Sequence, residues 1–550
     1  MKFDSLSFSR SKRYSRYFQT EFYLKYIFFN SLIFLSFFML KIKGKKILRT
    51  AAYRLLLTSA LLILLYCRAD NTRNEVIHAM SVLPSDLLPA VDNNIDAIQI
   101  YSQIYETLLL LDQDFKTLKP NLCKSWQTDS AGKSLTLELR GDVWFHDSSK
   151  FDAASLKFSI DWLKKNTKKN RILRCIDSLK VKNDSTLIIG LKEKRPAFIY
   201  ALASPSELPV ISAAAIKKYG LHISQNPTGS GPFKLQEWLK GDKIILTKNN
   251  AWWRGNVNID RIIFMGFKDY KRIEESLIQN KVDIVYAIRG YSLDRMKWMG
   301  KVNYAVNKSI STIFIGFNLK NKILNNKNIR KALAMSLNTN KIVNLINRGN
   351  ADISNNPLPA VFLNDNSGYS SQFNPEEAKR ILLQEGYAEG LTLNFYYPRN
   401  FFTRPTYVES IKTAFRKVSI TLNITAFDSW KELEEAMNNE SSQVFIYGWG
   451  AEILGDAGNF LRTLFYSTSK TNFFHYNNKD VDNILDKALR EKSSSLRDVY
   501  YREAVQRIMD DIPALFLMHV KEFYAYNKEK IKSVSISPYG IICYDKIILR

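Results

Sequence analysis

The segment NPTGSGPFKLQEWLKGD, residues 226–242, decides the fold, and the segment NNAWWRG, residues 249–255, follows it. Gly229 and Gly231 allow turn conformations that side chains forbid, and Pro232 stiffens the entry to a strand predicted from Phe233 to Trp238. Pro232 also removes a backbone N–H that a phosphate-binding loop would use. The segment therefore predicts a tight turn that leads into a strand, a structural element rather than a catalytic one.

Together the two segments resemble the signature of family 5 extracellular solute-binding proteins, the oligopeptide-, dipeptide- and nickel-binding components of bacterial ABC importers. That family has a P-x-G-[TS]-G-P-[YF]-x-[LV]-x-x-W turn and strand, followed by N-x-x-[YW]-W-x-G. Further landmarks of the family occur here in the right order, at residues 105–112 with 118–126, at 139–147, at 328–333 and at 512–517. Ser148 directly follows the landmark at 139–147, at a position where the family usually has glycine. The resemblance spans almost all of the chain after residue 70.

The resemblance implies an α/β fold, a two-lobed periplasmic-binding-protein fold of type II (cluster C-like) with an extra small domain inserted in the first lobe. Lobe I would comprise residues 70–108, 225–318 and 512–550, the inserted domain residues 109–224, and lobe II residues 319–511. Closure about hinges near Phe317 and Asp511 would enclose a solute and create the surface that a permease recognises.

Local patterns independently predict several elements. Strands are expected at residues 134–140 and 185–191, a helix at 152–164 and a longer helix at 328–345. Asn374 can cap a helix that starts at Pro375, with Glu377 completing a capping box.

The stretch YGWGAE, residues 447–452, resembles the W-x-x-D stretch of peptide-binding members, in which the acid pairs with the ligand's α-ammonium. Glu452 would take that role, worth about 4 kcal/mol of Coulomb energy at an effective dielectric near 20 before desolvation. Glutamate has one methylene more than the usual aspartate, so the cleft is remodelled or the ligand is not a standard peptide. Asp456 is the fallback partner, with Trp449 and Phe460 as walls of the cleft. The alternative for both acids is a solvated loop charge.

No HExxH, GxSxG, P-loop or GxGxxG pattern occurs, and no two of the five histidines have helical ligand spacing. We therefore predict neither an enzyme nor a cofactor or metal site. His146 and Asp147 are left out of the site, because the resemblance places them in a loop of the smaller domain. Cys123, Cys175 and Cys543 leave room for at most one disulfide, which stays open. The net charge of +26 is spread as a solvated surface, so nucleic acid is not expected as a partner.

Residues 1–69 are interpreted as a membrane-targeting region. The apolar stretches 26–40 and 55–66 are both shorter than the roughly 18–20 residues of a membrane span, and a basic flank before the second is typical of a secretory signal. Met39 is a possible true start. Cys67 is a possible lipidation site, although Tyr66 precedes it and cleavage before Asp70 is an alternative. The chain is thus expected in the periplasm or cell envelope, either soluble or anchored through lipid or an uncleaved apolar segment.

We expect a monomer that captures a peptide or similar-sized solute and delivers it to the ABC permease subunits of the inner membrane. Three alternatives remain open from the sequence. The scaffold could carry a nickel chelate, haem or an oligosaccharide, it could serve a ligand-sensing regulator, or the chain could be an exported hydrolase.

Overall fold

The computed structural model describes residues 74–89, 94–167, 171–267, 269–286, 290–308, 310–347, 350–354, 356–363, 373–399, 405–439, 441–451 and 454–550. The described residues belong to one structural unit, Asn74–Arg550. The predicted targeting region with Met39 and Cys67 lies outside the described residues, as does Glu452. Within the described ranges, no helix has both the length and the apolar character to cross a bilayer.

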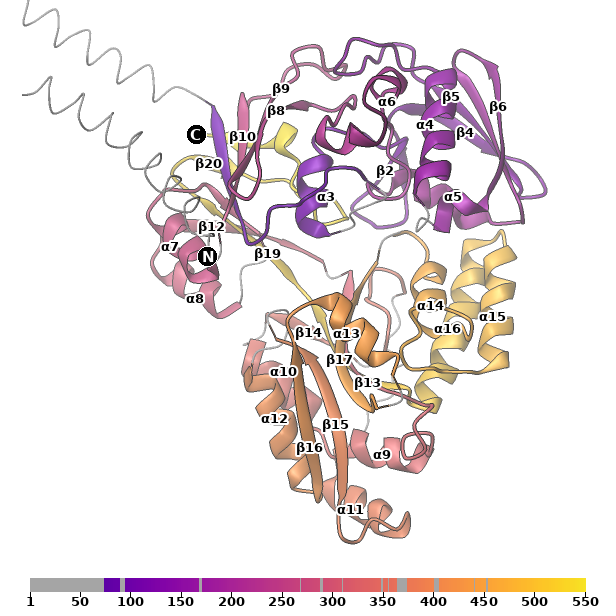
Figure 1. The fold of residues 1–550 in the computed structure, drawn as a ribbon, viewed down its shortest axis with the longest axis vertical. Coiled ribbons are helices and arrows are strands. Elements are labelled where there is room, and N and C mark those ends of the chain that lie inside the picture. Colours follow the sequence, from indigo (N-terminus) through magenta and orange to yellow (C-terminus); the bar gives the residue numbers. More distant parts are fainter. Residues whose placement is uncertain are drawn as a thin grey trace, which may run out of the picture. The chain divides into compact units, whose positions relative to one another are not determined.

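Lobe I is built on a seven-stranded sheet with the order β12-β19-β11-β1-β10-β9-β8 (Figure 1). Three stretches of chain supply it: β1 (Glu75–Met80); then β8 (Phe233–Leu239), β9 (Lys243–Lys248), β10 (Arg261–Gly266), β11 (Ile284–Val285) and β12 (Val302–Asn307); and finally β19 (Glu522–Asn527). The remaining elements of lobe I are α3 (Ile95–Tyr101), α7 (Tyr270–Ile278), α8 (Gly290–Trp298), β20 (Ile531–Ser533), η3 (Tyr544–Lys546) and β21 (Ile548–Leu549). β19 pairs antiparallel with both β11 and β12, so this late strand is an inner one.

Between β1 and β8 the chain forms a separate four-stranded antiparallel sheet with the order β4-β5-β7-β6. The elements of this segment are β2 (Leu109–Leu111), β3 (Leu118–Pro120), β4 (Cys123–Thr128), β5 (Ser134–Leu139), α4 (Ala153–Asn166), α5 (Arg171–Cys175), β6 (Ile176–Asn183), β7 (Thr186–Leu191), η1 (Pro196–Ala203), α6 (Ala213–Tyr219) and η2 (Gly220–Gln225). The predicted strands β5 and β7 and the predicted helix α4 are confirmed. Asp152 and Ser155 cap α4 reciprocally.

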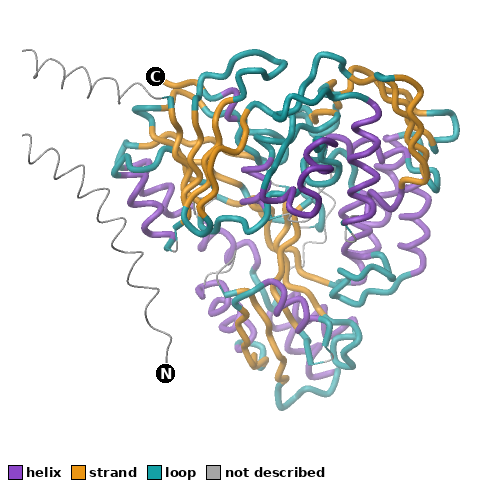
Figure 2. The backbone as a smooth tube through the Cα atoms, turned by 45° about the horizontal axis from the view of Figure 1, so that its top comes forward, coloured by secondary structure: helices purple, strands orange, loops and turns teal. Residues whose placement is uncertain are grey.

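Lobe II has a six-stranded sheet with the order β14-β18-β13-β17-β15-β16. Figure 2 draws the strands of the molecule in orange and its helices in purple. Its elements are β13 (Ser311–Phe317), α9 (Lys327–Met335), α10 (Thr339–Asn347), β14 (Ala351–Ile353), α11 (Pro375–Gln384), β15 (Leu391–Pro398), α12 (Pro405–Arg416), β16 (Ile420–Phe427), α13 (Trp430–Met437), β17 (Val444–Gly450) and β18 (Ala514–Val520). Three further helices precede β18: α14 (Gly458–Phe465), α15 (Lys479–Arg490) and α16 (Ser494–Asp511).

The central strands of lobe II are buried on both faces, because successive side chains point to opposite sides of a sheet. Ile313 and Ile315 join an aliphatic core with residues of α9 to α12. Phe314 joins the other core, where its ring lies 5.2 Å from that of Phe474 and 6.1 Å from that of Phe516. Both faces of these central strands are therefore covered, whereas β16, at the edge of the sheet, alternates buried and exposed residues.

The structure corrects the predicted hinges. β13 and β18 pair with each other in lobe II, whereas β12 and β19 pair in lobe I, so the chain changes sheet after Asn307 and before Ser311, and again at Lys521. Phe317 and Asp511 lie about one strand length away from these crossings, and the boundaries at 318 and 512 move with them. Both strands are buried apolar runs, and their hydrophobicity alone does not indicate which sheet receives them.

The single helix predicted over residues 328–345 is two helices, α9 and α10. Ser336 turns its hydroxyl back to the carbonyl of Leu333, and Asn338 accepts a hydrogen bond from the backbone N–H of Lys341 at 2.9 Å. Side chains that bond to nearby backbone in this way end one helix and start the next. The predicted cap of α11 is confirmed, since Asn374 accepts from the N–H of Glu377 at 3.0 Å, but Glu377 pairs with Arg380 instead of closing a capping box.

The sequence landmarks meet at one place in lobe I. Ser230, in the glycine-rich turn, donates to the buried carboxyl of Glu106 at 2.8 Å, and the indole of Trp253 donates to the same group at 3.0 Å. Burial raises the pKa of Glu106. A Cβ on Gly229 would collide with the carbonyl oxygen of Ile104, and one on Gly231 would lie 2.5 Å from that of Gln103. Neither glycine has a positive φ, so close backbone approach, and not the turn conformation predicted from sequence, requires them.

His146 joins the same cluster. Its Nε2 donates to the carbonyl of Gly231 at 3.0 Å, and its backbone N–H donates to that of Gly229 at 2.8 Å. The ring thus holds the turn, which accounts for its place in the landmark without any catalytic role.

Burial lowers the pKa of His146 to about 4, below its ordinary value near 6.5. The unfolded chain therefore binds a proton first as the pH falls, and the stabilisation present above pH 6.5 is lost between pH 6.5 and pH 4. We expect this residue alone to cost about 2–3 kcal/mol of the free energy of unfolding at pH 4. Urea melts at pH 6.5 and at pH 4 should show a smaller difference in the free energy of unfolding for His146→Gln than for the parent protein. His222→Gln, at an exposed site on η2, is the control, and equal pH dependence of both variants would contradict the assignment.

Candidate functional site

Three parallel strands end at the same edge of the lobe II sheet. β15 runs parallel to both β16 and β17, with α12 and α13 as the connections between them. In open α/β sheets, ligands bind in the crevice beyond the carboxyl ends of parallel strands. The residues at and after Pro398, Phe427 and Gly450 therefore form the candidate binding edge.

Aromatic side chains line this edge. Tyr447 lies at its centre, with its ring 5.1 Å from Trp430 at 81° and 6.5 Å from Trp449 at 26°. The Tyr447 hydroxyl donates to Glu434 at 2.6 Å, and burial raises its pKa, so it stays a neutral donor. Tyr447 itself is 4% exposed, which makes it the support on which the half-buried Trp449 rests. Stacked aromatic rings offer a ligand apolar surface with little conformational freedom to lose.

The other two strand ends add a second aromatic pair and a pair of charges. The rings of Tyr396 and Phe427 lie 5.3 Å apart in a T-shaped arrangement. Just beyond them, Arg399 pairs with Asp428 at 2.9 Å, and both side chains are more than half exposed. This edge thus presents apolar rings together with both signs of charge, the combination that a zwitterionic solute such as a peptide requires.

Of the predicted site residues, Trp449 alone lies at this edge among those described. Asp456 instead forms a buried pair with Arg497 of α16, with 2.7 Å between Oδ2 and Nε and side chains 9% and 6% exposed. Its Oδ1 accepts from the hydroxyl of Tyr501 at 2.6 Å and from the N–H of Gly458 at 2.9 Å. Both oxygens are occupied within the protein, so this arrangement gives no support to Asp456 as the fallback partner of a ligand ammonium.

Phe460 is also part of the interior. It is 1% exposed and its ring lies 5.9 Å from that of Phe362. A side chain covered to this extent supports the loop after β17 and does not form the wall of an open cleft. The place predicted for Glu452, three residues after Trp449, lies outside the described residues.

The loop after β17 also contacts the segment inserted in lobe I. Gly455 has φ +89° and faces the ring of Tyr200, in η1, so closely that a Cβ would overlap it. Further along, Lys116 pairs with Asp498 of α16 at 3.4 Å. Gly455 and α16 of lobe II therefore lie against the segment between β1 and β8.

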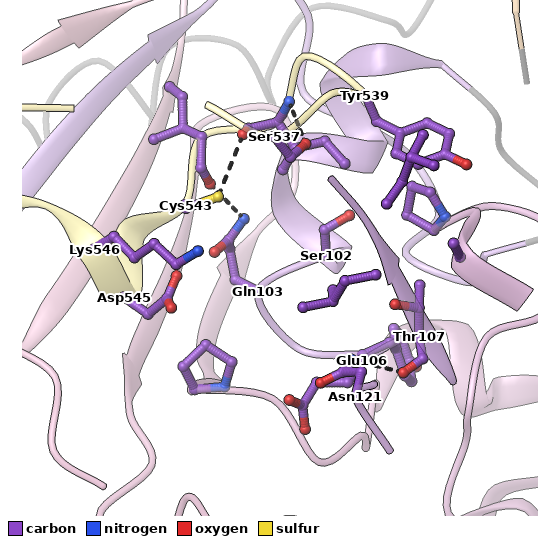
Figure 3. Close-up of a pocket in the computed structure, with 18 of the residues that line it drawn as sticks. Ser102, Gln103, Glu106, Thr107, Asn121, Ser537, Tyr539, Cys543, Asp545 and Lys546 are labelled. Carbon is purple, nitrogen blue, oxygen red and sulfur yellow. Dashed lines mark hydrogen bonds between the residues drawn. The ribbon is translucent and has the colours of Figure 1, made fainter. Parts of the chain in front are cut away.

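A mainly apolar cavity of about 150 Å³, lined from lobe I and from the segment between β1 and β8, lies beside the landmark cluster (Figure 3). Glu106, Asn121, Tyr539, Asp545 and Lys546 are among its lining residues. Ligand pockets for molecules of drug size occupy about 300–1,000 Å³, so this cavity does not hold a peptide. Burial raises the pKa of Asp545 as well as that of Glu106.

Sequence reasoning missed Trp430, Tyr396, Arg399 and Asp428. A signal was present, because strand-like runs at 391–398, 420–427 and 444–450 alternate with helical patterns, and such alternation brings carboxyl ends together at one edge. It also missed Arg497, for which the sequence offers no signal, since its partner is 41 residues away. In the described part of the chain, no three His, Cys, Asp or Glu side chains come together as a metal site would need.

Known proteins resemble this chain over most of its length. The family of bacterial extracellular solute-binding proteins, family 5, matches residues 117–472. The glutathione-binding protein GsiB of Pectobacterium atrosepticum is 25% identical over 458 residues, which cover 81% of this chain and 88% of that protein. GsiB of Escherichia coli is 26% identical over 466 residues, covering 82% and 90%.

Solved structures share the fold. The dipeptide-binding protein of a Pseudoalteromonas species, in complex with Met-Leu, superposes with a TM-score of 0.77 at 20% identity over 86% of this chain and 100% of that one. NikA of Brucella suis, in complex with Fe(III)-EDTA, gives 0.79 at 19% identity, with the same coverage of 86% and 100%. The predicted two-lobed α/β fold is confirmed by these likenesses, and the chain belongs to family 5 of the bacterial extracellular solute-binding proteins.

Proposed function

We propose that this protein is the binding component of an ABC importer, that it captures a peptide of about glutathione's size between its lobes, and that it passes the peptide unchanged to a membrane permease. The observation that carries the proposal is the binding edge of lobe II, where Trp449, Trp430 and the exposed Arg399–Asp428 pair meet at the ends of three parallel strands. Relatives named for glutathione binding support a small peptide over other solutes.

Enclosure of the ligand, and not bond-making, would be the work of this site. An aromatic platform fixes the apolar part of a peptide, and charges at the rim meet its termini. Ligand contacts that are made only in the closed state shift the equilibrium toward the closed lobes. The monomer suffices for this, because both lobes belong to one chain.

The first test is direct binding. Calorimetry with purified protein should show saturable binding of glutathione or of dipeptides and tripeptides, and the peptide should be recovered intact by mass spectrometry. A product of hydrolysis, or binding of a nickel chelate, haem or oligosaccharide with no affinity for any peptide, would replace the proposal by the corresponding alternative.

Glu452 remains the proposed partner of the ligand's α-ammonium, three residues after Trp449. We expect Glu452→Ala to weaken peptide binding at least tenfold by calorimetry, because a charge-assisted contact at the ligand terminus is lost. Glu435→Ala changes the same charge at an exposed position of α13 and is the matched control. An affinity unchanged by Glu452→Ala would remove this residue from the site.

We propose that the protein is exported and stays attached to the membrane. The apolar stretches at 26–40 and 55–66 and the cysteine at position 67 support export with retention at the membrane, through lipid on Cys67 or through an uncleaved segment. Mass spectrometry of the N-terminal peptide from fractionated cells separates the three forms: lipidated at Cys67, cleaved before Asp70, or uncleaved.

A further inference from the structure

An apolar surface lies at the end of α8 and along β12. Its members are Trp298, 88% exposed, Met299, 39%, Tyr304, 43%, and Val306, 48%. We call these four residues, with Lys297 and Lys301, the Trp298 tip. Among the large apolar side chains of the described residues, Trp298 has the highest exposure. A tryptophan left in water at this level, beside three further exposed apolar residues, indicates a surface that another structure covers.

The fold explains why the tip protrudes. Leu293 and Met296 bury one side of α8 in the core it shares with β12, and the helix then ends in a turn at Gly300, where φ is +65°. β12 is the last strand in the sheet order, paired with β19 alone. Tyr304 and Val306 are two residues apart and so share one face of this edge strand.

The tip is basic as well as apolar. The ammonium of Lys297 lies 4.1 Å from the centre of the Tyr304 ring, and Lys301 is exposed after the turn. Arg295, which lies two residues before Lys297 and is half exposed, pairs with Glu274 at 3.3 Å. The lysines therefore add positive charge that the neighbouring acid does not neutralise.

Strand register places the tip at the same end of lobe I as the start of the described chain. His78, Ile284, Tyr526 and Asn303 lie in one row across β1, β11, β19 and β12. β11 and β12 both run antiparallel to β19, and β1 runs parallel to β11. β1 and β12 therefore point the same way. Asn74 and the residues that precede β12 thus lie beyond the same end of the sheet, about 15 Å apart across three strand spacings.

We propose that the Trp298 tip docks on the surface of a bilayer rich in anionic phospholipid. Tryptophan and tyrosine concentrate at the membrane–water interface, where ring and polar group are both satisfied, and each lysine near an anionic surface adds electrostatic attraction. The chain before Asn74 supplies the second argument. Its apolar stretches end at residue 66, and the seven residues 67–73 that precede Asn74 span at most about 25 Å. A tether of that length would hold this end of lobe I within reach of the membrane.

The test uses the full chain and a signal local to the tip, because an inserted N-terminal segment would by itself hold the protein on vesicles. Vesicles are made from phosphatidylcholine alone or from equal parts of phosphatidylcholine and phosphatidylglycerol, with bromine on the acyl chains to quench tryptophan in contact with them. The part of the fluorescence that is quenched on the anionic vesicles should be absent in Trp298→Phe. It should remain in Trp144→Phe, whose tryptophan is 49% exposed in the segment between β1 and β8.

A charge-reversal pair tests the electrostatic part. We expect Lys297→Glu/Lys301→Glu to require about tenfold more anionic lipid, or more, for half of the quenching of Trp298. Lys180→Glu/Lys182→Glu makes the same change of charge on exposed β6 and should leave the lipid requirement as in the parent. Three results would each overturn the proposal. Quenching in Trp298→Phe could equal that of the parent, the two double variants could have equal effects, or quenching could be the same with and without phosphatidylglycerol. So would protection of Trp298 without vesicles in a species of twice the mass, since a second copy would then cover the tip.

Discussion

Gly229→Ala should lower the free energy of unfolding by about 4 kcal/mol or more, or leave no folded protein to measure. The new methyl group would overlap the carbonyl oxygen of Ile104, which accepts from the N–H of Gly231 at 2.9 Å. The neighbouring carbonyl of Gln103 accepts from the N–H of Phe233 at 3.1 Å, so the backbone opposite the turn is held and has no room to retreat. Urea denaturation followed by circular dichroism measures the loss.

Gly141→Ala is the matched control for that substitution. A Cβ at Gly141 would meet nothing within 4 Å, so its effect should stay within about 0.5 kcal/mol. If Gly229→Ala and Gly141→Ala proved equally stable, the close approach between the turn and residues 103–104 would be wrong. The whole landmark cluster around Glu106 would then need another explanation.

Asp456→Ala is the second large effect. It leaves the guanidinium of Arg497, whose side chain is 6% exposed, buried without its carboxylate, and it removes the acceptor of the Tyr501 hydroxyl. Breaking a buried ion pair by removing one partner costs about 3–5 kcal/mol, and we expect a loss of that size in urea melts. Asp428→Ala, which opens the exposed pair with Arg399, should cost less than about 1 kcal/mol.

The same variant separates two roles for Asp456. In a supporting role, the double variant Asp456→Leu/Arg497→Met should recover a large part of the lost stability, because no uncompensated charge stays buried. Unchanged stability of Asp456→Ala together with a lost affinity for peptide would instead return this carboxylate to the ligand.

Much of the fold follows from local sequence. The strands at 233–239 and 134–139 and the capped helices at 153–166 and 375–384 are all encoded by residues within a few positions of one another. Such signals depend on turn chemistry, alternation and caps, which act over short distances.

What the sequence left undecided depends on distant partners. Ser311–Phe317 and Ala514–Val520 are mainly apolar, and their place in lobe II is set by pairing with each other across about two hundred residues. The local sequence made Asp456 a candidate for ligand binding, but its carboxylate pairs with Arg497 on the distant helix α16. Trp449 was predicted as a wall of the cleft and stays a prediction in that role, whereas Trp430 and the Arg399–Asp428 pair needed the strand order to be known.

The place of β19 between β11 and β12 bears on how such a chain is made. As it leaves the ribosome, β12 has no neighbour in its own sheet until residues 522–527 emerge, more than two hundred residues later. Lobe I is therefore completed after synthesis, and contacts of such long range form slowly. The edge of lobe I that carries β12 can therefore close only when synthesis of the chain is nearly complete.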